Sequence, residues 1–286
     1  WAGGGIAGRN AHTVMPYNTW VVLTGVALLG AAAGPIGALA VLRRRALVGD
    51  ALAHATLPGL CLAFWLVGER YLPALLLGAL LSGLFGVAVL TWLAKATRIP
   101  PDAALGVVLS VFFGLGVVLA GMLQKRPGNK AGLDTFLFGK AAGLQWLDLL
   151  FLAGLAVLCL GVIVALFKEF QTLGFDRDFA AAQGWPVARL DLLLLGLIAV
   201  LVVVGLPAVG VVLVAALLIT PAATARLWTQ RLDRLLLLAA LVGALTGAVG
   251  AWISSTVPHA PTGAVIVLVG AAFFLFSAAW RGAAWR

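Results

Sequence analysis

The chain has 286 residues, of which 63% are hydrophobic and 10% charged, and its mean hydropathy is +1.11. Soluble domains carry about 25% charged residues, so this composition excludes an ordinary soluble enzyme, a disordered chain and a secreted disulfide scaffold. The net charge of +9 is compatible with nucleic-acid binding, anionic-lipid binding or membrane topology. Because the basic residues lie between apolar runs, we expect topology to explain them, and we expect no nucleic-acid partner.

The apolar runs predict a single transmembrane domain over residues 20–286, preceded by a loose N-terminal segment over residues 1–19. A helix that crosses a bilayer needs about 20 mostly apolar residues. Eight or nine spans are expected, because the two runs around residues 205–207 are short. In chain order the candidates are Trp20–Leu42, Asp50–Val67, Pro73–Ala94, Ala103–Leu123, Trp146–Phe167, Leu190–Leu206, Ala208–Ala223, Leu235–Ser255 and Gly263–Trp280. No alternating strand pattern occurs, so the fold class is all-α, a polytopic membrane helical bundle.

The basic residues predict the direction in which the chain crosses the membrane. With nine spans and the N-terminus outside, 13 of the 19 Lys and Arg residues fall on the inside and 6 outside. Such an excess marks the cytoplasmic side. The basic stretch Lys125–Lys140 runs against this bias, because it falls outside. We therefore expect a multi-pass membrane protein with its C-terminus in the cytoplasm.

Small residues recur every four positions within two of the expected spans. They are Gly78, Ser82 and Gly86 in one span, and Gly243 and Gly247 in another. Such faces let membrane helices approach closely. The pattern favours tight packing within one chain, with a dimer contact as the alternative.

The second span holds the best candidate for a chemical site. Ionisable residues inside a span are costly and usually functional. Asp50 and His54 are four residues apart, which places them on one helix face. A carboxylate oxygen and an imidazole nitrogen can together bind Mn²⁺, Fe²⁺ or Zn²⁺. The residues alone leave open the alternative of a buried hydrogen-bonded pair, or of an aspartate that favours the positive end of the helix.

Three further residues bear on the spans. Pro58 and Pro221 are expected to break their helices, because each removes the N–H that would bond the carbonyl four residues earlier. For Pro58 the freed carbonyl is that of His54, which can add an oxygen near the pair. For Pro221 the alternative is that the helix simply ends there. Cys61 lies seven residues after His54 and is a candidate soft ligand, although a small packing residue is the favoured interpretation.

The connection Lys168–Arg189 is long and falls on the inside. Asp176 and Asp178 precede an alanine-rich stretch that Gly184 and Pro186 terminate, a pattern typical of a short helix with acidic N-terminal residues. Such a helix can dock a partner protein, and a solvated loop helix is the alternative. The chain contains no GxxxxGK[ST], GxSxG or HExxH motif. We therefore expect it to lack P-loop ATP binding and to be no enzyme itself.

Four stretches together resemble the permease subunits of bacterial ABC importers for manganese, zinc or iron, the ABC-3 family. In sequence order they are GDALAHATLPG at 49–59, LDTFLFG at 133–139, FDRDFAAAQGWPV at 175–187 and VGVVLVAALLITPAATA at 209–225. The resemblance implies an ABC-importer permease fold in the bacterial inner membrane. It implies import of a divalent ion, Mn²⁺, Zn²⁺ or Fe²⁺ with Mn²⁺ or Zn²⁺ favoured, and no permanently bound cofactor.

The resemblance also implies partners and residue roles. The permease would form a homodimer with cytoplasmic ATPase subunits, which hydrolyse ATP, and an extracytoplasmic metal-binding protein would deliver the ion. Asp50 and His54 would contact the metal. The loop at 175–187 would be the coupling helix that docks on the ATPase, through Phe175, Asp176, Phe179, Ala180, Gly184 and Pro186.

Two other functions remain open from the residues. A carrier driven by an ion gradient would need no ATPase, but it would be expected to hold more acids within its spans than Asp50. A structural membrane subunit would need no transport site. A membrane enzyme would need a second catalytic group facing the first, and the sequence offers none.

Overall fold

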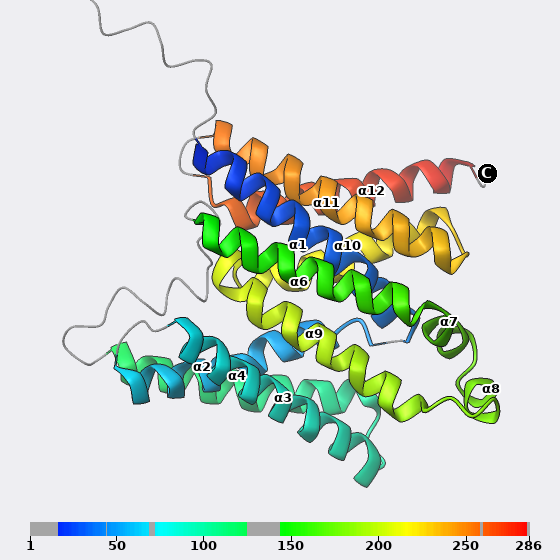
Figure 1. The fold of residues 1–286 in the computed structure, drawn as a ribbon, viewed down its shortest axis with the longest axis horizontal. Helices are drawn as coiled ribbons and strands as arrows, with labels where there is room; N and C mark the ends of the chain where they lie inside the picture. The colour runs from blue at the N-terminus through cyan, green and yellow to red at the C-terminus, as the bar shows by residue number, and fades with distance from the viewer. Residues whose placement is uncertain (1–16, 44, 69–71, 125–143, 258–259, 285–286) are drawn as a thin grey trace, which may run out of the picture.

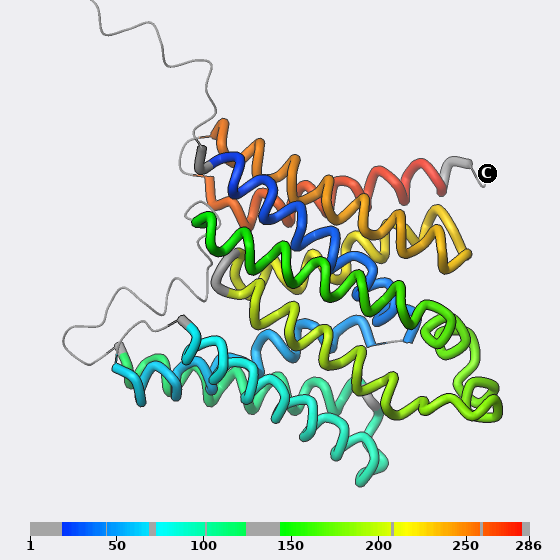
Figure 2. Tube along the Cα trace, in the orientation of Figure 1, coloured from blue at the N-terminus to red at the C-terminus, as the bar shows by residue number. Residues whose placement is uncertain are grey.

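The computed structural model describes residues 17–43, 45–68, 72–124, 144–257 and 260–284 (Figures 1 and 2). Three features of the sequence lie outside these ranges. They are the first 16 residues of the expected N-terminal segment, the basic stretch Lys125–Lys140, and the family-like stretch at 133–139.

The described residues form helices and contain no strand. Nine of these helices are long and apolar enough to cross a membrane, in the order predicted from the sequence. The helices are α1 (Tyr17–Leu42), α2 (Val48–Val67), α3 (Leu72–Ala96), α4 (Pro101–Gln124), α6 (Trp146–Ala165), α7 (Phe167–Phe175), α8 (Arg177–Ala182), α9 (Val187–Val209), α10 (Val211–Trp228), α11 (Leu232–Thr256) and α12 (Thr262–Ala284). The expected all-α polytopic bundle is therefore confirmed.

The spanning helices pack in two groups that α9 connects. In Figure 1, α1 lies among α6, α10 and α11, and α2 lies with α3 and α4 below them. Helix α9 contacts α1 and α6 on one side and α2 and α3 on the other. Helix α1 is the most buried span, and α12 is the least buried. The outer helices expose large apolar side chains such as Leu268 and Phe276, as lipid-facing helices do.

Small residues explain how closely the helices of each group approach. A Cβ atom added at Gly30 of α1 would collide with the carbonyl of Gly243 on α11. A Cβ atom at Gly78 of α3 would likewise meet the backbone of Gly59 on α2, and one at Gly86 would meet Ala55. The small-residue faces are thus used for packing within one chain, which is the interpretation the sequence favoured.

Two boundaries of the expected spans were wrong. The chain does not break at residues 205–207, because α9 continues through them to Val209. The break falls at Gly210, whose φ of 83° and ψ of 165° belong to a region open to glycine. Within a bilayer, backbone groups must be hydrogen-bonded inside the protein, and a continuous helix pairs nearly all of them. Helix α9 therefore continues past Pro207, which lies near its end.

The fifth span and the N-terminal boundary also differ from the prediction. Helix α6 ends at Ala165, and a separate short helix, α7, begins at Phe167. Helix α1 begins at Tyr17, so its first three residues belong to the segment that we expected to be loose. These residues continue the helical pattern of the span that follows them.

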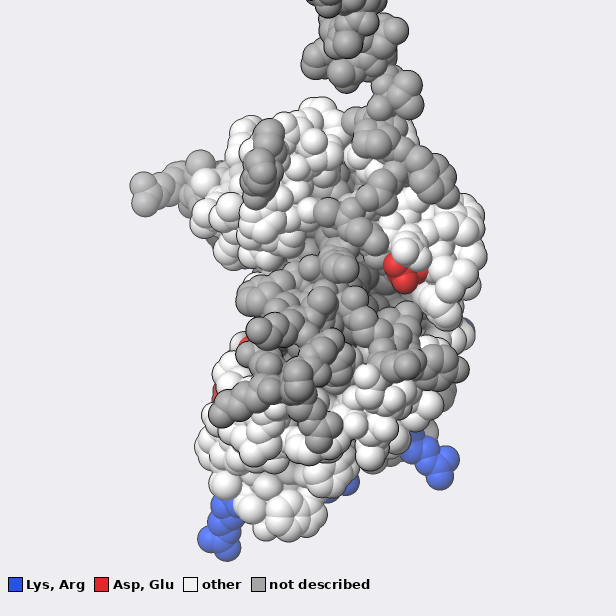
Figure 3. All heavy atoms as spheres, turned by 90° about the vertical axis from the view of Figure 1, so that its left-hand side faces the viewer, with Lys and Arg blue, Asp and Glu red and all other residues white. Residues whose placement is uncertain are grey.

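The described basic residues gather at one end of the bundle, which we call the α7–α8 end. Eight of the 19 Lys and Arg residues lie outside the described ranges, and the other 11 all lie in helix ends or connections at this end. Figure 3 looks onto the opposite end, where the visible described atoms are mostly white, with blue atoms only along the lower edge. Among the described residues, the basic side chains are therefore confined to one end of the bundle.

Candidate functional site

Asp50 and His54 lie on one face near the start of α2, as their spacing predicted. The Oδ1 atom of Asp50 is 3.6 Å from Nε2 of His54, and the two side chains are 37% and 22% exposed. This distance is too long for a hydrogen bond. Two ligands about 2.1 Å from a tetrahedral metal ion lie about 3.4 Å apart. The separation therefore suits a pair that brackets a cation better than a pair bonded to itself.

The imidazole of His54 is held by packing and keeps one nitrogen unpaired. Its ring meets Phe113 of α4 edge-on, with 4.8 Å between the ring centroids. Its Nδ1 atom is buried and has no hydrogen-bond partner among the described residues. A buried nitrogen without a partner costs free energy, so natural structures retain few of them. The Phe113 contact thus holds the ring in place, while its Nδ1 atom makes no hydrogen bond with the described residues.

The backbone around the pair is supported from two neighbouring helices, α10 and α3. Gly49 packs against the side chain of Leu218 on α10, and Ala55 faces Gly86 on α3. The hydroxyl of Ser82 on α3 donates a hydrogen bond of 2.6 Å to the carbonyl of Ala55. These contacts place the pair on a rigid part of α2.

Neither of the two prolines breaks its helix, which corrects the prediction. Pro58 lies inside α2, which continues to Val67, and Pro221 lies inside α10, which continues to Trp228. Both rings are buried in helix contacts, and this packing holds the helix together where one hydrogen bond is missing. Pro58 still lacks the N–H that would bond the carbonyl of His54.

Cys61 does not join Asp50 and His54. Its side chain is buried, and its Sγ atom lies 3.8 Å from the carbonyl oxygen of Gly116 on α4, in a separate apolar cluster. Seven residues along a helix correspond to about 10 Å from His54. Within the described ranges, no three His, Cys, Asp or Glu side chains meet in a group that could hold a metal. The contacts of Cys61 are those of a packing residue.

The connection between α6 and α9 forms two short helices, α7 and α8, at one end of the bundle. Asp176 caps α8, because its Oδ1 atom accepts hydrogen bonds from the backbone N–H groups of Asp178 (2.9 Å) and Phe179 (3.1 Å). Phe175 and Phe179 are 73% and 54% exposed. Two exposed aromatic side chains on adjacent short helices form an apolar surface that a partner protein can cover.

The other expected coupling residues shape the segment. Gly184 has a φ of 84°, which lets the chain turn out of α8, and Pro186 immediately precedes α9. Ala180 is fully buried, so it anchors α8 on the bundle and offers no surface to a partner. Trp185, which the sequence reasoning overlooked, is 37% exposed between Gly184 and Pro186. An aromatic residue next to two turn residues is the signal that could have identified it.

A family profile decides the relationship of this chain to known proteins. The profile of the ABC 3 transport family matches residues 15–281. The chain belongs to this family. Its nine described spans are accordingly the transmembrane helices of a family member, and the Asp50–His54 pair lies within the matched region.

Two proteins and one solved structure illustrate what this chain is similar to. The manganese transport system membrane protein MntC of Bacillus subtilis is 44% identical over 91% of this chain, which spans 60% of that protein's length. The zinc transport system membrane protein TroC of Treponema pallidum is 46% identical over 88% of this chain and 85% of its own length. The structure of PsaBC from Streptococcus pneumoniae in complex with Fab superposes with a TM-score of 0.79, at 32% identity over 91% of both chains.

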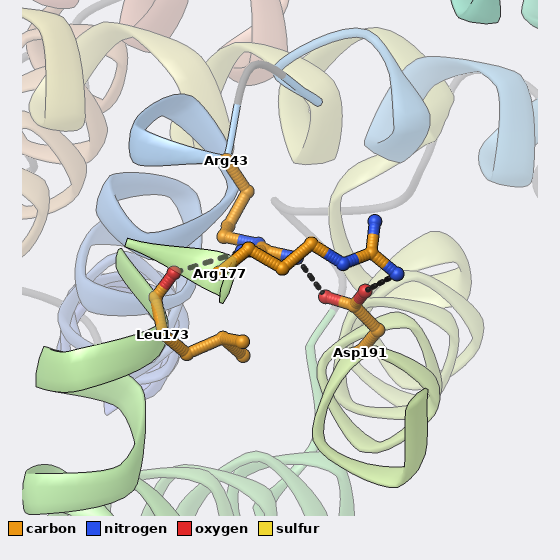
Figure 4. Close-up of polar contacts among 4 residues, drawn as sticks. All are labelled: Arg43, Leu173, Arg177 and Asp191. Atoms are coloured by element: carbon orange, nitrogen blue, oxygen red, sulfur yellow. Dashed lines mark hydrogen bonds and ion pairs between the residues drawn. The ribbon is translucent and has the colours of Figure 1, made fainter. Parts of the chain in front are cut away.

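A second charged group, absent from the sequence predictions, lies at the α7–α8 end of this family member (Figure 4). The carboxylate of Asp191 on α9 lies 2.5 Å from the guanidinium of Arg43 and 3.6 Å from that of Arg177. Arg43 also donates a hydrogen bond of 2.8 Å to the carbonyl of Leu173 on α7. The position of Asp191 at the start of an apolar run was a signal in the sequence. Its partner Arg43 could not be found in this way, because it is 148 residues away in the chain.

Proposed function

We propose that this chain is the membrane permease subunit of an ATP-driven importer that moves a divalent transition metal, Mn²⁺ or Zn²⁺ rather than Fe²⁺, into the bacterial cell. The observation that carries the proposal is the Asp50–His54 pair, 3.6 Å apart on a membrane-spanning helix of an ABC 3 family member. Names of manganese and zinc transport proteins among its relatives support this choice of cargo.

The pair suits transient rather than permanent binding. One oxygen and one nitrogen occupy two coordination positions, and water, the free His54 carbonyl or a second copy of the chain would supply the others. Both side chains are partly exposed, so an ion can reach them and leave. A transport site must bind its ion weakly enough to release it. The ion is therefore cargo, and no cofactor remains bound.

The position of the described basic residues supports an orientation in the membrane. The 11 described Lys and Arg residues lie at the α7–α8 end, and basic residues gather on the cytoplasmic side of bacterial membrane proteins. With nine spans, this bias supports an N-terminus outside and a C-terminus in the cytoplasm. Helices α7 and α8 then face the compartment that contains ATP.

The exposed aromatic surface of α7 and α8 supports docking of a separate ATPase. Phe175 and Phe179 would enter a groove on that subunit, and its closure on ATP would move the two short helices. Hydrolysis would occur in the ATPase, so this chain is no enzyme. We further propose that two copies form a homodimer around the metal path, and that an extracytoplasmic metal-binding protein delivers the ion.

Uptake by the purified complex in proteoliposomes tests the function. We expect ATP inside the vesicles to drive accumulation of radioactive Mn²⁺ or Zn²⁺, and a protonophore to leave accumulation unchanged. Competition among Mn²⁺, Zn²⁺ and Fe²⁺ identifies the preferred ion. Accumulation that needs an ion gradient and no ATPase would favour a gradient-driven carrier, and no accumulation of any of the three ions would refute a metal importer.

A further inference from the structure

Asp191 is a buried carboxylate at the junction of four chain segments. Its side chain is 10% exposed, although it lies on a helix that the sequence marks as a span. One oxygen contacts Arg43 at the end of α1, and the other faces Arg177 in the first turn of α8. Because removing a charge from water costs several kcal/mol, such a group persists where specific partners compensate it.

Arg43 connects this carboxylate to α7. One guanidinium nitrogen, Nη2, contacts Asp191, and another, Nη1, donates to the carbonyl of Leu173. The planar guanidinium fork holds the two acceptors in a fixed relation that a lysine cannot reproduce. Figure 4 shows Arg43 between Leu173 on one side and Asp191 on the other. The end of α1 is thereby bonded to α7 and α9 at once.

The same group lies next to the start of the metal-site helix. Arg43 is followed by a short connection to Val48, where α2 begins, and Asp50 is the third residue of α2. A cavity of about 270 Å³ beside Asp191 is lined by Arg45, Val48 and Arg177, among other residues. The start of α2 therefore has free space on the side that faces α8 and α9.

Asp191 also balances more than one cation. Burial lowers the pKa of Arg45, and the charges of Arg43 and Arg177 lower it further, whereas Asp191 acts in the opposite direction. The backbone of Arg45 is bonded to both neighbouring helices, because its N–H donates to the carbonyl of Ala40 (2.8 Å) and its carbonyl accepts from the N–H of Val48 (3.1 Å). Without the carboxylate, three guanidinium groups would repel one another around the entry to α2.

We propose that Asp191 and Arg43 form a positioning clamp that transmits movement of α7 and α8 to the start of α2, and so to the Asp50–His54 pair. This inference rests on the proposed function, because it assigns the clamp to coupling between the ATPase and the metal site. It differs from a purely structural role, since a structural ion pair would affect folding but not the number of ions moved per ATP.

Two variants separate these roles in the reconstituted complex. Arg43→Lys keeps the positive charge beside Asp191 but loses the fork to Leu173, and Asp191→Asn keeps the shape but loses the charge. We expect both to assemble with the ATPase and hydrolyse ATP, and to import about fivefold fewer ions per ATP. Asp233→Asn is the matched control, because Asp233 forms an exposed pair with Arg231 (3.6 Å) at the same end of the bundle.

A double-variant cycle adds a second measurement. Arg43→Gln and Asp191→Asn, combined, should lose no more coupling than the more severe single variant, because both remove the same connection. Losses that multiply would overturn the clamp. Should either variant fail to assemble, Arg177→Gln keeps the inference testable, since Arg177 is 58% exposed and its removal should lower coupling about twofold.

The outcomes also distinguish this inference from the proposed function. If the wild-type complex imports no metal on ATP, the proposed function fails. If the wild type imports metal, and Arg43→Lys, Asp191→Asn and Arg177→Gln keep the wild-type ratio of ions to ATP, the clamp alone is refuted.

Discussion

Two carboxylates, Asp50 and Asp191, lie near the starts of the neighbouring membrane helices α2 and α9, and each faces a nitrogen atom of another side chain. Asp50 is 37% exposed, and its histidine partner is 3.6 Å away. Asp191 is 10% exposed, and its arginine partner is 2.5 Å away. The first pair is partly exposed and its two groups are not in direct contact, whereas the second is buried and in direct contact. Burial and partner distance thus distinguish the pair that we propose as the metal site from the buried ion pair that we propose as a clamp.

The largest expected effect is loss of transport when the Asp50–His54 pair is altered. Asp50→Asn and His54→Gln each remove a ligand while keeping the side-chain shape. We expect each to lower ATP-driven metal uptake about 100-fold, because the loss of one of two metal ligands weakens binding by about 2.7 kcal/mol. Radiotracer uptake with the reconstituted complex measures this.

The control for the Asp50–His54 pair is Asp102→Asn, an exposed acid in the first turn of α4. It should leave uptake unchanged, and all three variants should bind the ATPase normally. Wild-type uptake by both Asp50→Asn and His54→Gln would remove the metal site from this pair.

For stability we expect the larger loss at the buried pair, so that Asp191→Ala destabilises the protein more than Asp50→Ala does. Asp191→Ala leaves the Arg43 guanidinium buried without its partner, and we expect a loss of about 3–5 kcal/mol in unfolding free energy. Asp50→Ala should cost less than about 1 kcal/mol, because its carboxylate is partly exposed and makes no hydrogen bond with a described residue. Thermal unfolding of the purified permease in detergent compares the two, and equal losses would contradict the distinction between the two pairs.

An effect of intermediate size is expected for the surface of α7 and α8, on the binding of the ATPase. Phe179→Ala removes an aromatic side chain that is 54% exposed, and we expect about tenfold weaker binding of the ATPase. Leu268→Ala on α12 is the matched control, because Leu268 is 69% exposed on a lipid-facing helix. Binding in detergent is the measurement, and equal affinity of both variants would place the docking surface elsewhere.

The smallest effect is expected at Cys61. Because its Sγ atom packs against Gly116 and lies about two helical turns from His54, Cys61→Ala should leave uptake within about twofold of wild type. It should cost about 1 kcal/mol of stability through lost packing. A loss of uptake comparable to that of His54→Gln would instead make Cys61 a ligand.

Local signals in the sequence predicted most of what is local in the structure. Asp176 precedes an alanine-rich stretch and caps α8, and Asp50 and His54 share a face because they are four residues apart. Pro58 and Pro221 misled, because a proline changes one backbone hydrogen bond, whereas buried helix contacts along α2 and α10 keep both helices continuous. Helix periodicity carries no information about such neighbours.

The sequence by itself determined the order of the described spans, limited their number to eight or nine, and determined the basic end of the described bundle and the spacing of the Asp50–His54 pair. Each of these follows from hydropathy, charge or helical period within about 20 residues. Only the tertiary structure decided that Ala180 is buried while Phe179 is exposed, and that Cys61 packs against Gly116 away from the pair. It alone brought Arg43 to Asp191, because the packing of α1 against α7 and α9 joins residues that no local pattern relates.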